Sequence, residues 1–145
     1  MAKTELRSEV EIEASPERVY AVLTDFDRYA EWNPFLTAVR GQLQVGAVLA
    51  VELSLPEGKT YELSPEVTHV TENNLIRWRS RLLLPSLLEA EQFFQLSERA
   101  GKTRVMQGQD FSGFLLRFGG NSLTLAARGA VYMNQALKKR AESGA

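Results

Sequence analysis

The first residues of the chain alternate between apolar and charged side chains. Leu6, Val10 and Ile12 fall at even positions, and the charged residues around them fall at odd ones, namely Glu5, Arg7, Glu9, Glu11 and Glu13. Successive side chains of a strand point to opposite faces of a sheet, so this period of two predicts a strand that is buried on one face and hydrated on the other.

The period changes to that of a helix after this strand. Ser15 is a favourable N-cap, and Pro16 suits the first helical position, where its missing N–H would have no partner anyway. Apolar residues then recur at helical spacing, at Val19, Val22, Leu23 and Phe26. A second short turn over 27–31 follows, and Pro34 ends it because the residue before a proline is pushed toward extended geometry. We expect Trp32 to pack this helix pair onto a sheet.

Alternating residues in the middle of the chain predict a run of antiparallel strands. A hairpin around Thr71–Asn74, a turn near Pro85 and a turn at Glu98–Gly101 give them one register. The pairs set opposite each other are Val70 and Leu75, Val67 and Trp78, Glu66 and Arg79, Arg81 and Glu91, Trp78 and Phe94, Phe94 and Val105, and Gln92 and Gln107. A slip by one residue would expose Trp78 and bury three arginines, so this register is favoured.

The last periodic segment follows the Gly119-Gly120 pair and runs as a helix to about Glu142. Its sheet-facing stripe consists of Ala126, Ala130, Met133 and Leu137. Asn134 lies on the same side, where a buried amide needs a hydrogen-bond partner. That partner is either the backbone of the turn at 32–34 or a bound ligand.

This order of elements, together with several short motifs, resembles a known superfamily. The motifs are Trp32-Asn33-Pro34-Phe35, the strand segments Leu75–Ser80 and Glu91–Leu96, the strand end Phe111-Ser112-Gly113, and Met133-Asn134 followed by Leu137-Lys138. Over nearly the whole chain they are similar to the START/Bet v 1-like (SRPBCC) superfamily, and within it to the polyketide cyclase/dehydrase-like branch.

The resemblance implies an α+β helix-grip fold. In this fold a curved antiparallel sheet of six or seven strands wraps around a long C-terminal helix, and two short helices follow the first strand. The resemblance also implies a single START-like ligand-binding domain over residues 1–145. Members of the superfamily share a ligand cavity but use it differently, so the function has to be argued from the residues that line the cavity.

Composition narrows the function classes further. The 145 residues carry a net charge of −1, which gives no basic surface for nucleic acid. The absence of cysteine excludes disulfides and thiolate chemistry, and a single histidine excludes a multi-histidine metal site. We expect neither a metal nor a cofactor. The first residues lack an apolar signal core, and no stretch reaches the roughly 18 apolar residues of a membrane span. We therefore expect a cytoplasmic protein.

Four polar residues fall on the inner face of the predicted sheet, namely His69, Gln92, Gln107 and Gln109. A buried polar group without a hydrogen bond costs about 1–3 kcal/mol, so these groups either pair with one another or are satisfied by water or a ligand. Three neighbouring amides favour the polar wall of a hydrated cavity, whereas a local hydrogen bond or contact with solvent is the commoner outcome for His69. The expected ligand-binding residues are Trp78, Phe94, Gln92, Gln107, Gln109, Val105, His69, Ala130, Met133 and Asn134.

Two loop tips, Leu82–Leu88 and Phe114–Phe118, are unusually apolar. Three roles are open for these tips. They cover each other, they line a gated entrance for an apolar ligand, or they touch a membrane or partner protein transiently. No stable membrane insertion is expected.

Three functions remain open. The first is binding or transport of a small hydrophobic molecule, such as a lipid, polyketide, isoprenoid or aromatic, in a cavity between the sheet and the last helix. The second is a cyclase- or dehydratase-type enzyme that uses the same cavity, with His69 as general base. This enzyme is less favoured because no acid is predicted on the inner face. Many relatives have an acidic residue just before the Phe-Ser-Gly strand end. In this chain Gln109 is predicted to point inward at that place and Asp110 outward. The third is a co-chaperone or assembly module that acts through the apolar tips.

Overall fold

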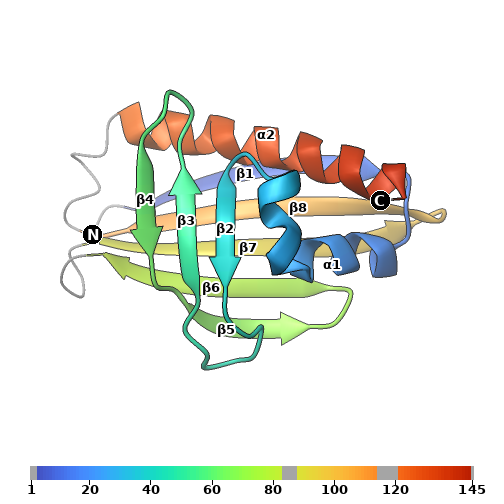
Figure 1. Ribbon diagram of the computed structural model, residues 1–145, viewed down its shortest axis with the longest axis horizontal. Coiled ribbons are helices and arrows are strands. Elements are labelled where there is room, and N and C mark those ends of the chain that lie inside the picture. The colour runs from blue at the N-terminus through green and yellow to red at the C-terminus, as the bar shows by residue number, and fades with distance from the viewer. Residues whose placement is uncertain (1–2, 83–87, 114–120, 145) are drawn as a thin grey trace.

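The computed structural model describes residues 3–82, 88–113 and 121–144, so both apolar tips lie mainly outside the described residues. The elements follow the expected order of a strand, two short helices, a run of strands and a long helix (Figure 1). They are β1 (Lys3–Ile12), α1 (Pro16–Thr24), the 3-10 helix η1 (Phe26–Glu31), β2 (Leu36–Arg40), β3 (Ala50–Ser54), β4 (Thr60–Leu63), β5 (Glu66–Thr71), β6 (Leu75–Leu82), β7 (Leu88–Arg99), β8 (Lys102–Ser112) and α2 (Asn121–Ser143).

The strands form two antiparallel sheets that meet at the edge of β5. One sheet has five strands in the order β1-β8-β7-β6-β5, and the other has three in the order β2-β3-β4. Backbone hydrogen bonds join them, from Leu49 N to the Pro65 carbonyl at 2.8 Å and from Val67 N to the Ala47 carbonyl at 2.9 Å. Pro65 lies between β4 and β5 and has no N–H to donate to a neighbouring strand, so the β-ladder is interrupted there. The described part of the chain therefore has eight strands instead of six or seven.

The long helix α2 lies along the sheet beside β1 (Figure 1). Its buried side contains the predicted stripe, namely Ala126, Ala130, Met133 and Leu137. Gly129 belongs to the same side: a Cβ there would lie 2.4 Å from an atom of the Phe35 ring, so the glycine makes room for that ring. The expected helix-grip fold is confirmed.

Local sequence accounts for the start of α1 and for the turn into β2. The Ser15 hydroxyl accepts a hydrogen bond from Arg18 N at 3.2 Å, as predicted for an N-cap. At the turn, Asn33 Oδ1 accepts hydrogen bonds from Phe35 N at 3.0 Å and from Leu36 N at 2.9 Å. Asn33 is 4% exposed, so a buried side chain directs the backbone into β2.

The predicted pairing of β5 with β6 is confirmed at Glu66–Arg79 and Val67–Trp78, but the later pairs are shifted by two residues. The observed partners are Trp78 with Gln92, Arg81 with Glu89, Phe94 with Gln107, and Gln92 with Gln109. In place of the expected four-residue turn, β7 and β8 are joined by Ala100 and Gly101 alone, at φ values of 54° and 80°. Such two-residue turns match the twist of paired strands. A shift of two leaves each side chain on its predicted face.

Candidate functional site

Three glutamines of the inner face are joined to α2 by hydrogen bonds. Gln107 on β8 is fully buried, and its Nε2 donates to the Ala130 carbonyl at 3.1 Å and to Asn134 Oδ1 at 2.7 Å. Its Oε1 accepts from Gln92 Nε2 and Gln109 Nε2, both at 3.0 Å. Gln109 Nε2 also donates to Gln92 Oε1 at 3.0 Å. We call these four side-chain amides the amide network.

Asn134 ends the amide network on the helix side. Its Nδ2 donates to Ser8 Oγ at 3.0 Å, while its Oδ1 accepts from Gln107. Asn134 therefore bonds to Gln107 and Ser8, and not to the turn at 32–34, which was one of its two predicted alternatives. Ser8 is a site residue that the alternation pattern did not single out, although it occupies an even, inward position of β1 and its burial alternates with that of its charged neighbours.

The other predicted ligand-binding residues of this face lie around the amide network. Trp78 packs edge to face against Phe94, with ring centroids 6.0 Å apart. Ser80, a buried neighbour on β6, was not predicted as a site residue. Among the described residues, none forms a hydrogen bond with the Trp78 indole N–H or the Ser80 hydroxyl. Three more of the predicted residues are buried, namely Val105, Ala130 and Met133.

Burial of the inner face decreases along β8 toward the end of the sheet where β1 begins, at the left in Figure 1. Val105 and Gln107 are 0% exposed, Gln109 is 4% exposed, and Phe111 is only partly buried. Leu6, Leu53 and Leu63 are among the other apolar residues that pack against the core but remain partly exposed. Gln109 therefore lies where the cover of the inner face becomes incomplete.

His69 does not lie on the inner face, so its prediction as a cavity residue is wrong. A β-bulge at Thr68 interrupts the ladder between β5 and β6 and turns the following side chains over. His69 consequently faces Arg77 and is exposed, with its Nδ1 3.1 Å from Thr68 Oγ1. Val70 faces Ile76, one residue away from its predicted partner. A catalytic base at His69 would act on the outer face of the sheet.

The outer face of the same strands carries charged side chains. Asp110 Oδ1 lies 2.7 Å from Arg7 Nη1, and Glu91 Oε2 lies 2.8 Å from Arg77 Nη1. Both guanidinium groups stack over the Phe93 ring, at 4.8 and 4.6 Å from its centroid. Asp110 therefore points outward, as predicted. Among the described residues, the inward positions of β1, β3 and β5–β8 and the buried side of α2 carry no charged side chain.

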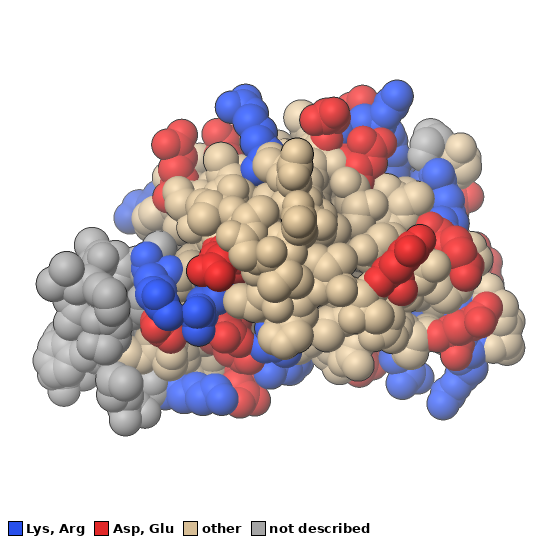
Figure 2. Space-filling model, turned by 90° about the horizontal axis from the view of Figure 1, so that it is seen from below, with Lys and Arg blue, Asp and Glu red and all other residues tan. Residues whose placement is uncertain are grey.

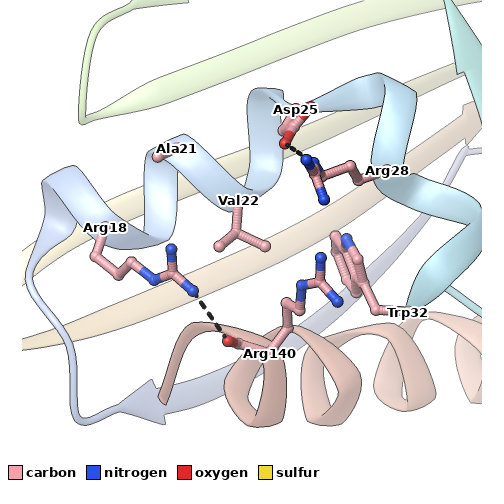
Figure 3. A pocket seen from close by; sticks show the side chains of 7 residues that line it. All are labelled: Arg18, Ala21, Val22, Asp25, Arg28, Trp32 and Arg140. Atoms are coloured by element: carbon pink, nitrogen blue, oxygen red, sulfur yellow. Dashed lines mark hydrogen bonds and ion pairs between the residues drawn. The ribbon is translucent and has the colours of Figure 1, made fainter. Parts of the chain in front are cut away.

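A separate pocket of about 300 Å³ lies between α1, η1 and the end of α2 (Figure 3). Three arginines line it, and each holds a partner: Arg18 donates to the Ala141 carbonyl (3.2 Å), Arg140 pairs with Glu31 (2.8 Å) and Arg28 pairs with Asp25 (3.3 Å). Trp32 also lines the pocket and packs edge to face on Tyr29, with ring centroids 5.2 Å apart. The contacts of Arg18 with Ala141 and of Arg140 with Glu31 join the end of α2 to α1 and η1.

Figure 2 shows one long side of the molecule, on which side chains of both charges surround a largely uncharged centre. The loop between β2 and β3 lies on this side, at the lower edge in Figure 1, and exposes Val45 (59%) and Val48 (63%). Within the part of the chain that the structure describes, no helix is both long and apolar enough to cross a membrane.

The arrangement of the elements is a helix-grip fold, which the chain shares with a solved START superfamily protein. The family model for polyketide cyclase/dehydrase and lipid transport proteins matches residues 3–142. The chain therefore belongs to this family. No curated protein matches the sequence.

Several solved structures resemble the chain over nearly their whole length. The ZhuI aromatase/cyclase from a Streptomyces species is 16% identical with a TM-score of 0.78, over 97% of this chain and 94% of that one. A START superfamily protein from Mycobacterium smegmatis is 20% identical with a TM-score of 0.76, over 97% and 99% of the two chains. A protein from Mesorhizobium loti is 21% identical with a TM-score of 0.76, over 98% and 99%. At these identities the likeness shows the fold alone.

Proposed function

We propose that the protein binds a small hydrophobic ligand between the inner face of the sheet and α2. The observation that carries the proposal is a set of inward polar atoms that have no hydrogen-bond partner among the described residues. They are the Trp78 indole nitrogen, the Ser80 hydroxyl and Gln109 Oε1. None of the three is a fully buried atom, so each stays open to a hydrogen bond from water or from a ligand.

The rest of this face favours an apolar molecule. Phe94 and Phe111 lie on the inner face, and the partly exposed Leu6, Leu53 and Leu63 pack against the core. Burial of apolar surface contributes about 25 cal/mol per Å², which gives useful affinity even after the entropy of binding is deducted. The family's description as cyclase, dehydrase and lipid transport proteins supports the same ligand classes: a lipid, a polyketide, an isoprenoid or an aromatic.

The two tryptophans allow a direct test of the binding site. In Trp32→Phe, Trp78 is the only tryptophan, and its emission should shift as the neutral dye N-phenylnaphthylamine or decanol is added. In the matched variant Trp78→Phe, the remaining Trp32 lines the pocket between the helices and should not respond. A response from Trp32 alone would refute the inner-face site. Native mass spectrometry of freshly purified protein would then identify the class of any retained ligand.

A cyclase- or dehydratase-type enzyme in the same place is the second candidate. The family match and the likeness to an aromatase/cyclase favour it, and the Trp78 N–H or the Ser80 hydroxyl could hold a carbonyl oxygen of the substrate. Against it, the described inward positions include no histidine or acid that could serve as general base. Conversion of a β-keto substrate by the wild type, reduced about 100-fold or more in Ser80→Ala, would establish the enzyme instead.

The third expected function, an interaction module that uses the apolar tips, depends on residues that lie mainly outside the described part of the chain.

A further inference from the structure

The Ala130 carbonyl fixes the orientation of the amide network. A backbone carbonyl only accepts hydrogen bonds, so the Gln107 atom 3.1 Å from it must be the amide nitrogen. Gln107 Oε1 then faces the sheet, and the two atoms 3.0 Å from it must be the nitrogens of Gln92 and Gln109. The direction of each side-chain amide thus follows from one backbone group.

The network leaves an acceptor open at Gln109, while the Gln92 nitrogen donates only to Gln107 Oε1 and keeps a second N–H. Gln107 has no bonding capacity left, because both of its N–H groups donate and its oxygen accepts twice. Gln109 also uses its nitrogen twice, toward Gln107 Oε1 and Gln92 Oε1. Its own Oε1 therefore points away from the network, and no described residue donates to it. Turning this amide over would set its oxygen against two other oxygens, so the acceptor is fixed in place.

The surroundings of this acceptor disfavour an anion. The described inward positions of β1, β3 and β5–β8 and the buried side of α2 carry no charged side chain. An ionised carboxylate could accept from the Trp78 N–H or the Ser80 hydroxyl, but it would have no proton for Gln109 Oε1 and no opposite charge among the described inward residues. Burial of an unpaired ion is very unfavourable, whereas a hydroxyl or N–H group can donate to the free oxygen.

We propose that the inner-face site takes an uncharged hydrophobic molecule that donates a hydrogen bond from a hydroxyl or N–H group to Gln109 Oε1. The site therefore discriminates against the carboxylate of the same chain length. This inference rests on the proposed function and narrows its ligand class.

Three ligands with the same ten-carbon chain test the inference, namely 1-decanol, 2-decanone and decanoate, which is ionised at about pH 8. They are titrated into Trp32→Phe with Trp78 emission as the readout. Decanol should bind at least about tenfold more tightly than decanoate and about fivefold more tightly than 2-decanone, which accepts but cannot donate. Equal affinity of decanol and either other ligand would overturn the inference but leave the proposed function intact. No response to any of the three would overturn both.

A pair of glutamine variants tests the role of Gln109 itself. Gln109→Leu removes the acceptor and keeps much of the volume. Decanol and 2-decanone should therefore bind to this variant with about equal affinity. Gln95→Leu makes the same change at an exposed position of β7 and should keep the wild-type ratio. An unchanged ratio in folded Gln109→Leu would overturn the assignment. If circular dichroism shows that this variant is unfolded, the ranking of the three ligands with Gln109 in place decides the matter.

Discussion

A single buried amide directs the chain from η1 into β2. Asn33 Oδ1 accepts hydrogen bonds from two successive backbone nitrogens, and the residue is 4% exposed. Its neighbour Trp32 is larger but only partly buried, at the edge of the pocket between the helices. Polar side chains that bond to nearby backbone in this way favour turns. The stability of this turn therefore depends more on the short polar residue than on the aromatic one beside it.

Asn33→Ala should lower the free energy of unfolding by about 1–3 kcal/mol, because it leaves the N–H groups of Phe35 and Leu36 without their acceptor. Asn33→Asp keeps an oxygen at the same place but buries a carboxylate whose second oxygen replaces the unpartnered Nδ2, so it should lower stability as well. Urea denaturation of both variants at pH 7 measures the difference. A loss in Asn33→Ala below about 0.5 kcal/mol, the range of ordinary surface substitutions, would contradict this account of the turn.

Among the elements, the strands show what periodicity predicts and what it omits. Alternation assigned most side chains of β6, β7 and β8 to the correct face, because an error of two residues in register preserves the face. Between β7 and β8 the error arose at the turn of Ala100 and Gly101, whose backbone is set by positive φ values that alternation does not encode. Between β6 and β7 it arose at the predicted turn near Pro85, which lies outside the described residues. The bulge at Thr68 shifts the ladder by one residue, so it moved His69 to the opposite face.

Helix α2 contains a glycine whose role depends on packing. Alanine is favoured over glycine in a helix by about 1 kcal/mol, so helix propensity alone predicts that Gly129→Ala stabilises the protein. A Cβ at this position would lie 2.4 and 2.8 Å from two atoms of the Phe35 ring, and Phe35 is only 2% exposed. Overpacking of this kind costs about 1–3 kcal/mol. We therefore expect Gly129→Ala to be destabilising.

Thermal unfolding should show a lower Tm for Gly129→Ala than for the wild type. Gln135→Ala, at an exposed position of the same helix, is the control and should change stability by no more than about 0.5 kcal/mol. In the double variant Gly129→Ala with Phe35→Leu, the loss should be smaller than the sum of the two single losses, because the smaller side chain removes the clash. A stabilised Gly129→Ala would show that propensity outweighs packing here.

At the scale of the whole molecule, the amide network joins β1, β7, β8 and α2. Alternation predicted that Gln92, Gln107 and Gln109 share the inner face, and helical spacing predicted that Asn134 is buried. Their mutual hydrogen bonds were one of the alternatives that the pattern left open, and it could not select them. They require the observed register, which sets Gln92 opposite Gln109, and the docking of α2 over the sheet. Both are tertiary features that no local pattern encodes.

A second long-range connection fixes the end of α2 to the end of β1. Glu142 Oε2 accepts hydrogen bonds from Lys138 Nζ at 2.6 Å and from Glu13 N at 2.8 Å. Lys138 Nζ also donates to the Glu11 carbonyl at 2.9 Å. The hydrogen bond from Lys138, followed by that from the Glu13 backbone, holds the pKa of the Glu142 carboxyl below its ordinary value. The folded state therefore favours the ionised form of this side chain.

This lowered pKa predicts how stability depends on pH. A carboxyl whose pKa is lower in the folded state stabilises the protein above its ordinary pKa, and the stabilisation is lost as the pH falls through the folded value. Glu142→Gln should therefore lower Tm at pH 7 by about 1–3 °C, a modest shift because the pair is exposed, and the difference should shrink as the pH falls below the ordinary Glu pKa of about 4.3 and through the lower folded value. Glu9→Gln removes an exposed carboxylate with no ion pair among the described residues and should not show this pattern. A difference between wild type and Glu142→Gln that persists unchanged at pH 3 in calorimetry would show that Glu142 acts through packing and not through its charge.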